Sequence, residues 1–185
     1  MIEAEVLGEH LVVEGFKNIE VNDVDLLLNL IKGCSGKAHV QVMDAALIAG
    51  FEHIFFAVLN ALKSFKSGLN ISKSLAVEIL LFASGQDQIK KAIEFLGIKQ
   101  SSSTAALVIV ADEREEAIAT LEKISEFLKG ERDHKVIELT EEKIPNIIKT
   151  FNISEAEIEA SMRESLKEAV KNVLIERAAL LITQH

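Results

Sequence analysis

Apolar residues recur along the chain with two different periods, which predict a protein of strands and helices. Residues 3–13 alternate apolar and polar side chains around a glycine, and this pattern predicts two strands or one bent strand. Residues 39–43, 107–110 and 136–139 also have strand patterns. The run at 107–110 is rich in β-branched residues, so we expect it at the centre of a sheet.

Helical spacing separates these strand patterns. Asn22 is a plausible N-cap for the first helix, and Asp112 with Glu115 resembles a capping box at the start of the last. The helix at 75–83 is apolar on nearly all sides, with Glu78 as its one charge, so we expect it to be buried. The predicted helices occupy residues 22–33, 48–65, 75–83, 86–96 and 112–128.

The C-terminal part of the chain predicts further helices. Pro145 suits the first turn of a short helix that ends at Phe151. Ser154 and Glu157 form a second capping box, which opens a helical pattern that continues to Ile182. A straight helix of that extent would be about 42 Å long, so we expect a bend or a break. Apolar side chains from residue 173 onward cover more than one face, which indicates either a partner surface or a terminal helix buried on two sides.

Together these patterns predict an α/β fold. We expect residues 1–185 to form a single domain, in which a mixed, partly antiparallel sheet is packed by several helices and a long C-terminal helix.

Composition narrows the compartment and the kinds of partner. The 185 residues include 29 acidic and 20 basic side chains, a net charge of −9, which disfavours non-specific duplex binding through global charge. Cys34 is the one cysteine, and no secretory signal is visible at Met1. The longest apolar run, 105–111, is far shorter than a membrane span. We therefore expect a soluble, cytoplasmic protein with no membrane contact.

No catalytic or metal-binding constellation is apparent, and we expect no cofactor. The segment 33–37 resembles a phosphate-binding loop, but it lacks the first glycine and the hydroxyl residue after Lys37. Two readings of the reactive side chains stay open. Glu78 is expected to be a structural carboxylate with hydrogen-bonding partners. The alternative is a small hydrolase whose reactive side chains would come from Cys34, His39, His53 and Glu78.

The segment from residue 63 to 99 is locally basic. It has six lysines and three acidic residues, a balance of +3 within an acidic chain. Lysines beside Asn, Ser and Gln side chains suit a single-stranded RNA end, for which Phe56 is the one obvious stacking aromatic. The alternative is a solvated basic face.

Several segments of this region resemble one known family. They are Ile48-Ala-Gly-Phe-Glu-His53, Asn70-Ile-Ser-Lys-Ser-Leu75 and Glu78-Ile-Leu-Leu-Phe-Ala-Ser-Gly85, and the chain continues with Gly97-Ile-Lys99. With these segments, residues 42–99 closely resemble the Cgi/TPRKB family, a small subunit of the KEOPS tRNA-modification complex. A looser match continues to Ala178, and Phe82 stands where many relatives have Tyr.

The resemblance implies a non-enzymatic subunit. Such proteins bind the N-lobe of the small atypical kinase/ATPase of KEOPS, stimulate it, and help bring tRNA to the subunit that makes threonylcarbamoyladenosine. Archaeal members are associated with the single-stranded CCA tail of tRNA. A structural adaptor without RNA contact is the alternative. The implied kinase-binding residues are Leu174, Ile175, Ala178, Leu181 and Ile182, and the implied RNA-binding residues are His53, Lys63, Lys66, Asn70, Lys73, Ser84, Gly85, Gln88, Lys91 and Lys99.

Overall fold

The computed structural model describes residues 1–181. Their contacts divide the chain into two compact units, each of which is assembled from two separate stretches of the sequence. Unit 1 contains residues 1–46 and 97–137, and unit 2 contains residues 47–96 together with the described residues from 138 onward. Whether residues 1–185 behave as a single domain stays a prediction.

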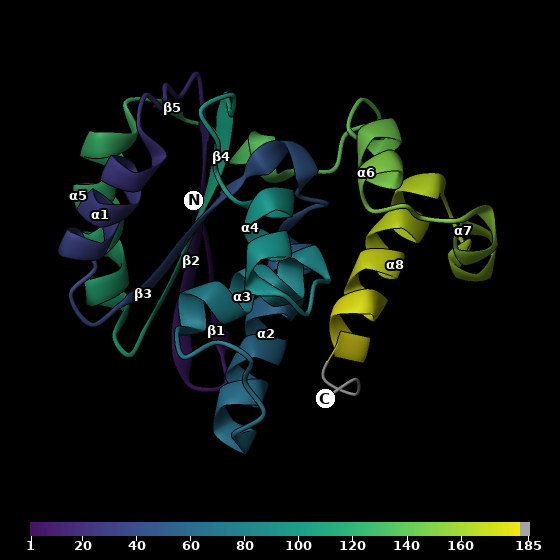
Figure 1. Cartoon of the computed structure of the whole chain (residues 1–185), viewed down its shortest axis with the longest axis horizontal. Coiled ribbons are helices and arrows are strands. Elements are labelled where there is room, and N and C mark those ends of the chain that lie inside the picture. Colours follow the sequence, from purple (N-terminus) through teal and green to yellow (C-terminus); the bar gives the residue numbers. More distant parts are fainter. Residues whose placement is uncertain (182–185) are drawn as a thin grey trace. The chain divides into compact units, whose positions relative to one another are not determined.

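Unit 1 is built on a five-stranded sheet (Figure 1). The strands β1 and β2 form the predicted N-terminal hairpin, because Leu7 and Gly8 both adopt the positive φ that a two-residue type I′ turn requires. The strand order is β1-β2-β4-β3, and β5 pairs with β2. The strands are β1 (Ile2–Val6), β2 (Glu9–Lys17), β3 (His39–Asp44), β4 (Thr104–Ala111) and β5 (Glu131–Arg132).

The sheet confirms the α/β class and the central position of residues 107–110. These residues lie in β4, which pairs with β2 on one side and β3 on the other. Every strand pairing in the described part of the chain is antiparallel, so the parallel component of the expected mixed sheet is not found there.

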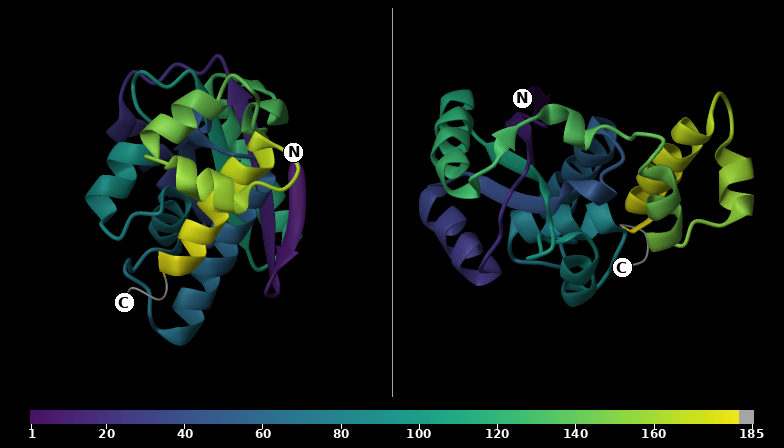
Figure 2. Two further views of the ribbon diagram at one scale, coloured as in Figure 1. Left: turned by 90° about the vertical axis from the view of Figure 1, so that its right-hand side faces the viewer. Right: turned by 90° about the horizontal axis from the view of Figure 1, so that it is seen from above.

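Two helices, α1 (Val24–Cys34) and α5 (Arg114–Leu128), cover one face of this sheet (Figures 1 and 2). Leu27 and Ile31 of α1 and Leu121 and Ile124 of α5 point into a shared core with alternate residues of β2 and β4. Val24 and Cys34 of α1 are partly buried against this core, and the other residues of the helix are exposed. Packing on this face of the sheet thus explains why apolar residues recur at helical spacing in both segments.

Three expectations for unit 1 are wrong in detail. The N-cap of α1 is Asp23, whose carboxylate accepts a hydrogen bond from the Leu26 amide at 2.9 Å, and not Asn22. The helix α5 begins after Glu113 without a side-chain cap, so Asp112 and Glu115 form no capping box. Residues 136–139 form no strand.

The segment expected as the last strand forms the 3₁₀ helix η2 (His134–Ile137). The Asp133 amide donates to the Gly15 carbonyl at 2.8 Å, and the Asp133 carboxylate accepts from the Lys135 amide at 3.1 Å. This local capping starts a turn. A Cβ at Gly15 would lie 2.5 Å from the Asp133 carbonyl oxygen, so the glycine permits the close approach of this segment to β2.

Unit 2 is helical. The predicted helices at 48–65 and 75–83 are confirmed as α2 and α3, which end at Gly68 and Gly85 in the left-handed conformation. The helix α8 packs against α2, α3 and α7. The helices are α2 (Phe51–Ser67), α3 (Leu75–Ser84), α4 (Ile89–Leu96), α6 (Ile144–Thr150), α7 (Glu155–Ser161) and α8 (Leu166–Leu181), and the short 3₁₀ turn η1 (Ala45–Leu47) precedes α2.

The C-terminal helical pattern is broken, as its length predicts. The break between α7 and α8 spans residues 162–165, and Ser165 starts α8 by accepting a hydrogen bond from the Glu168 amide. The capping box of Ser154 and Glu157 is present at the start of α7, and Pro145 lies in the first turn of α6. No helix among residues 1–181 is long and apolar enough to cross a bilayer.

Candidate functional site

The helices α2 and α3 form an antiparallel hairpin whose contact face consists of small and polar side chains. His53, Ala57, Asn60 and Ser64 recur at helical spacing on α2, and all four are buried. Phe51, Phe55 and Phe65, on the large apolar stripe of the same helix, are less buried. Small side chains allow the two helices to approach closely, so the polar face of α2 is an inner face of unit 2.

At one end of this hairpin, the Glu78 carboxylate is fully buried and accepts three hydrogen bonds. The donors are the Ser64 hydroxyl at 3.1 Å, the Ile71 amide at 3.1 Å and the Ser72 amide at 2.8 Å. A buried carboxylate needs such donors, because burial removes its hydration. The expectation of a structural carboxylate is confirmed, and the carboxylate holds the loop between α2 and α3 in place.

Four of the predicted RNA-binding residues surround this loop. Lys63 and Lys66 lie in the last turns of α2, and Lys73 precedes α3; all three side chains are exposed. The half-buried Asn70 donates its side-chain N–H to the Ser72 carbonyl at 2.9 Å, which leaves its carbonyl oxygen pointing away from that bond. We call Lys63, Lys66, Asn70 and Lys73 the basic loop cluster.

The predicted residues His53, Ser84 and Gly85 lie at the opposite end of the hairpin. His53 is ten residues before Lys63 on α2, a separation of about 15 Å along the helix axis. The Ser84 hydroxyl is buried and donates to the Leu81 carbonyl at 3.1 Å, and Gly85 is the C-cap of α3. The structure therefore divides the predicted RNA-binding set between two places.

The His53 ring is buried, and both of its nitrogens form hydrogen bonds within the protein. Its Nδ1 accepts from the Ala49 amide at 3.2 Å, so Nε2 carries the proton and donates to the Ala83 carbonyl at 2.8 Å. Burial lowers the pKa of His53 to about 4, while its bond to the Ala83 carbonyl opposes the shift. The ring is neutral at physiological pH. Burial gives His53 a structural position inside unit 2, and its contact with RNA stays a prediction.

A cavity of about 30 Å³ lies beside Ser84 and Gly85, with Phe151, Leu174 and Arg177 among its lining residues. This volume suits one or two water molecules and not a nucleotide base. This cavity beside Ser84 and Gly85 is therefore too small for a base.

The remaining predicted RNA-binding residues are not part of the basic loop cluster. Gln88 lies just before α4 and Lys91 lies within it, and both are exposed. The neighbouring Lys90 pairs with Glu94 at 3.8 Å. Lys99 belongs to unit 1 and is half-buried. The candidate stacking residue Phe56 is 37% exposed, and its ring packs edge-on against Phe55.

The predicted kinase-binding residues of α8 point mostly inward. Leu174, Ala178 and Leu181 are buried in the packing of α8 within unit 2, as the alternative of a terminal helix buried on two sides expects, and their contact with the kinase stays a prediction. Ile175 is half-buried, and Ile182 lies outside the described residues. Two leucines of this helix are exposed, Leu166 by 39% at its start and Leu180 by 55% near its end.

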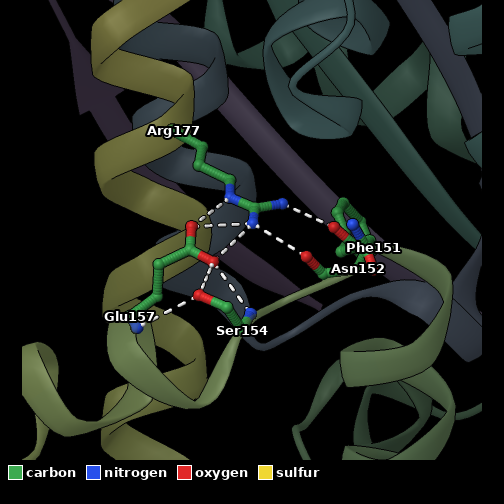
Figure 3. A network of polar contacts seen from close by, with 5 residues as sticks. All are labelled: Phe151, Asn152, Ser154, Glu157 and Arg177. Atoms are coloured by element: carbon green, nitrogen blue, oxygen red, sulfur yellow. Dashed lines mark hydrogen bonds and ion pairs between the residues drawn. The ribbon is translucent and has the colours of Figure 1, made fainter.

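Arg177 of α8 forms a polar network that the sequence analysis did not identify (Figure 3). Its guanidinium donates to both carboxylate oxygens of Glu157 at 2.7 and 2.9 Å, and to the carbonyls of Phe151 and Asn152. Bonds from the Ser154 amide and from Arg177 lower the pKa of Glu157 to about 2. Lys171 pairs with Glu52 at 3.3 Å, so α8 is tied to α2 as well as to α7.

The rival hydrolase arrangement finds no support in this geometry. Cys34 packs against the core of unit 1, and the exposed His39 belongs to the same unit. His53 and Glu78 belong to unit 2, where their polar atoms are occupied by the bonds described above. Among residues 1–181, no group of three or more His, Cys, Asp or Glu side chains could hold a metal ion.

Comparison with known proteins agrees with the resemblance. Residues 16–180 match the family described as kinase binding protein CGI-121. The chain is 30% identical over 143 residues to the regulatory protein Cgi121 of Methanocaldococcus jannaschii. The aligned residues cover 77% of this chain and 85% of that protein. It is also 38% identical over 61 residues to the KEOPS complex subunit Cgi121 of Pyrococcus abyssi. These aligned residues cover 33% of this chain and 36% of that protein. The chain therefore belongs to the CGI-121 family of kinase-binding proteins.

Proposed function

We propose that the chain is a non-catalytic subunit of a KEOPS-type complex that modifies tRNA with threonylcarbamoyladenosine. In this role it binds and activates the small atypical kinase/ATPase through the N-lobe of that kinase, and it helps recruit tRNA by its single-stranded CCA tail. Family membership and the name of the Pyrococcus abyssi relative support the kinase and the complex. The basic loop cluster supports the RNA contact.

The observation that carries the RNA contact is the combination of exposed lysines with a loop held from inside by Glu78. Lys63, Lys66 and Lys73 supply charge for phosphates in a chain that is otherwise acidic. The Ile71 and Ser72 amides are already bonded to Glu78. Recognition of the tail therefore depends on side chains, namely the lysines and the carbonyl oxygen of Asn70. An ordered loop loses less conformational entropy on binding than a mobile one.

His53, Ser84 and Gly85 have a supporting role in this proposal. Their polar groups close the far end of the α2–α3 hairpin, where His53 links the start of α2 to the Ala83 carbonyl at the end of α3. The bond between His53 and the Ala83 carbonyl holds the two helices together at this end.

A test of the RNA contact is the double variant Lys63→Glu/Lys73→Glu. Its matched control is Lys149→Glu/Lys167→Glu, which reverses two exposed lysines on α6 and just inside α8. Loss of two phosphate contacts lowers the slope of log affinity against log salt by about 1.4 for a single strand. We expect that change for the loop variant and none for the control. If the wild-type protein and the loop variant have equal slopes of log affinity against log salt, the RNA contact is contradicted and the chain is a structural adaptor.

The proposed kinase contact is the outer side of α8. This side is formed by Ile175, Glu176, Ala179 and Leu180, since their neighbours Leu174, Ala178 and Leu181 are used inside unit 2. An apolar side chain exposed on a well-packed helix is a typical anchor for a partner.

Co-purification with the kinase tests this surface. We expect Leu180→Arg to weaken the complex roughly tenfold or more, as loss of a buried apolar anchor does. The control is Leu166→Arg, which changes a leucine that is 39% exposed at the other end of the same helix. If Leu180→Arg binds the kinase as wild-type protein does, the outer side of α8 is not the interface.

A further inference from the structure

The helix α1 carries more apolar side chains than its packing in unit 1 uses. Leu27 and Ile31 are buried in the core, whereas Leu26, Leu28 and Leu30 are 57%, 41% and 37% exposed. Leu26 and Leu30 are four residues apart and therefore share one face of the helix. This face belongs to unit 1, whereas the basic loop cluster and α8 belong to unit 2.

Leu26 and Leu30 line one side of a groove of about 200 Å³. The other side comes from the end of α5, where Phe127 and Leu128 contribute apolar surface, and Val21 lies between the two. Small-molecule pockets typically reach about 300 Å³ or more and enclose their ligand. A smaller groove whose leucines remain exposed suits side chains presented by another helix. Leu28 does not line the groove.

Acidic side chains border the groove. Glu20, Asp23 and Glu126 line it, against one basic residue, Lys129. Within residues 1–181, none of the three acidic residues forms an ion pair. The Asp23 carboxylate caps α1 and is exposed. Unit 1 as a whole has 16 acidic and 9 basic side chains, a net charge of −7.

We infer that this groove, the α1 groove lined by Val21, Leu26, Leu30, Phe127 and Leu128, docks a basic amphipathic helix of a partner protein. The apolar floor takes the apolar face of that helix, and the acidic border pairs with its lysines or arginines. The same border repels RNA phosphates and anionic lipid. A second copy of the chain would bring two acidic borders together in a two-fold dimer, which disfavours that occupant.

A synthetic peptide tests the inference with the full-length chain. The probe is an amphipathic helix of about 18 residues, with leucines on one face and lysines on the other. Its counterpart has glutamates in place of the lysines. We expect the lysine peptide to shift the methyl resonances of Leu26 and Leu30, and Leu26→Asp/Leu30→Asp to weaken its binding roughly tenfold or more. The matched control Leu28→Asp changes an exposed leucine of the same helix outside the groove, and it should bind as wild-type protein does.

The charge of the border is tested separately. Glu20→Lys/Glu126→Lys should weaken binding of the lysine peptide at about 50 mM salt, and the difference should shrink at about 500 mM, where charges are screened. Equal binding of both peptides, an unchanged affinity of Leu26→Asp/Leu30→Asp, or shifts confined to other surfaces would overturn the inference. So would a dimer in sedimentation that Leu26→Asp/Leu30→Asp abolishes, because the occupant would then be a second copy.

Discussion

At the scale of single residues, Glu78 determines the conformation of the loop between α2 and α3. Its two carboxylate oxygens accept from Ser64 inside the hairpin and from Ile71 and Ser72 in the loop. Hydrogen bonds to a charged group stabilise more than neutral ones, and a buried donor without an acceptor is costly. The loop that follows Lys66 and presents Lys73 therefore depends on a residue that itself contacts no solvent.

We predict that Glu78→Gln releases this loop. The amide group presents N–H where one carboxylate oxygen accepted, so at least one of the Ile71 and Ser72 bonds is lost, which costs about 1–3 kcal/mol of unfolding free energy. Hydrogen exchange at the Ile71 and Ser72 amides should accelerate. The control Glu94→Gln changes an exposed carboxylate and should leave both amides protected. Unchanged exchange in Glu78→Gln would show that the loop is held by other contacts.

His53 should make stability depend on pH. Because burial lowers its folded-state pKa from 6.5 to about 4, the unfolded chain binds a proton more readily than the folded protein between those values. The neutral His53 ring therefore contributes to the free energy of unfolding above about pH 6.5, and this contribution is lost as the pH falls towards 4. The loss amounts to at most about 3 kcal/mol. Urea unfolding measured from pH 7.5 to 4 checks this.

The control for His53 is a second histidine. His39→Gln removes an exposed ring and should keep the pH dependence, whereas His53→Gln should be less stable at neutral pH and lose that component of the dependence. A wild-type stability that is flat between pH 6.5 and 5 would contradict the assignment.

The sequence reveals Glu78 but not the role of His53. A lone charge in an apolar helix must find partners, so the environment of Glu78 follows from the pattern alone. The partners of His53 are backbone groups of Ala49 and Ala83, and the second of these is 30 residues away. Such a bond exists only after α2 and α3 have packed, so periodicity cannot show it.

At the scale of elements, Arg177 fixes α7 on α8. The helix α7 has seven residues and no buried side chain, so helix propensity and packing provide little stability of its own. The capping box and the Arg177 network supply the missing contacts, and the network also reaches the carbonyls of Phe151 and Asn152 at the end of α6 (Figure 3).

We predict that Arg177→Met loosens α7 without unfolding unit 2. Loss of hydrogen bonds between a guanidinium and a partly exposed carboxylate should cost roughly 1–2 kcal/mol after solvent screening. Amides of α7 should exchange faster, while those of α2 and α3 should not. Arg163→Met removes an exposed arginine between α7 and α8 and serves as the control. Equal protection of α7 in both variants would contradict the role of Arg177.

Element boundaries depended on local capping that the apolar pattern does not contain. The break before α8 follows from Ser165 acting as a cap for the Glu168 amide, within a charged stretch that is compatible with one continuous helix. The turn at residues 134–137 replaces a strand because Asp133 bonds both to Gly15 and to Lys135. The strong apolar stripe of α2 needed no such help and was predicted, whereas the helix at 112–128 was predicted from a capping box that does not form.

At the scale of the whole molecule, the two units differ in net charge. Unit 1 has a net charge of −7, whereas unit 2 has 13 acidic and 11 basic side chains, a net charge of −2. The lysines of the basic loop cluster lie in the less acidic unit. Recruitment of RNA by a chain with a net charge of −9 therefore requires a local surface, and contact with phosphates should weaken steeply as salt rises.

The sequence predicted this local surface only in part. The lysine count between residues 63 and 99 is visible without a structure, and so is the loop at Asn70. The division of that region between the two ends of the hairpin, and the assignment of Lys99 to unit 1, result from tertiary packing. The apolar excess of α8 was likewise visible, but only packing decides that Leu174, Ala178 and Leu181 face inward.

The most direct test compares tRNA that carries its terminal CCA with tRNA that lacks it, binding to the wild-type chain over a series of salt concentrations. The account predicts that the intact tRNA binds more tightly and that its affinity falls with salt, because lysines of the basic loop cluster contact the phosphates of the tail. Equal affinity for the two tRNAs, or a signal insensitive to salt, would contradict it.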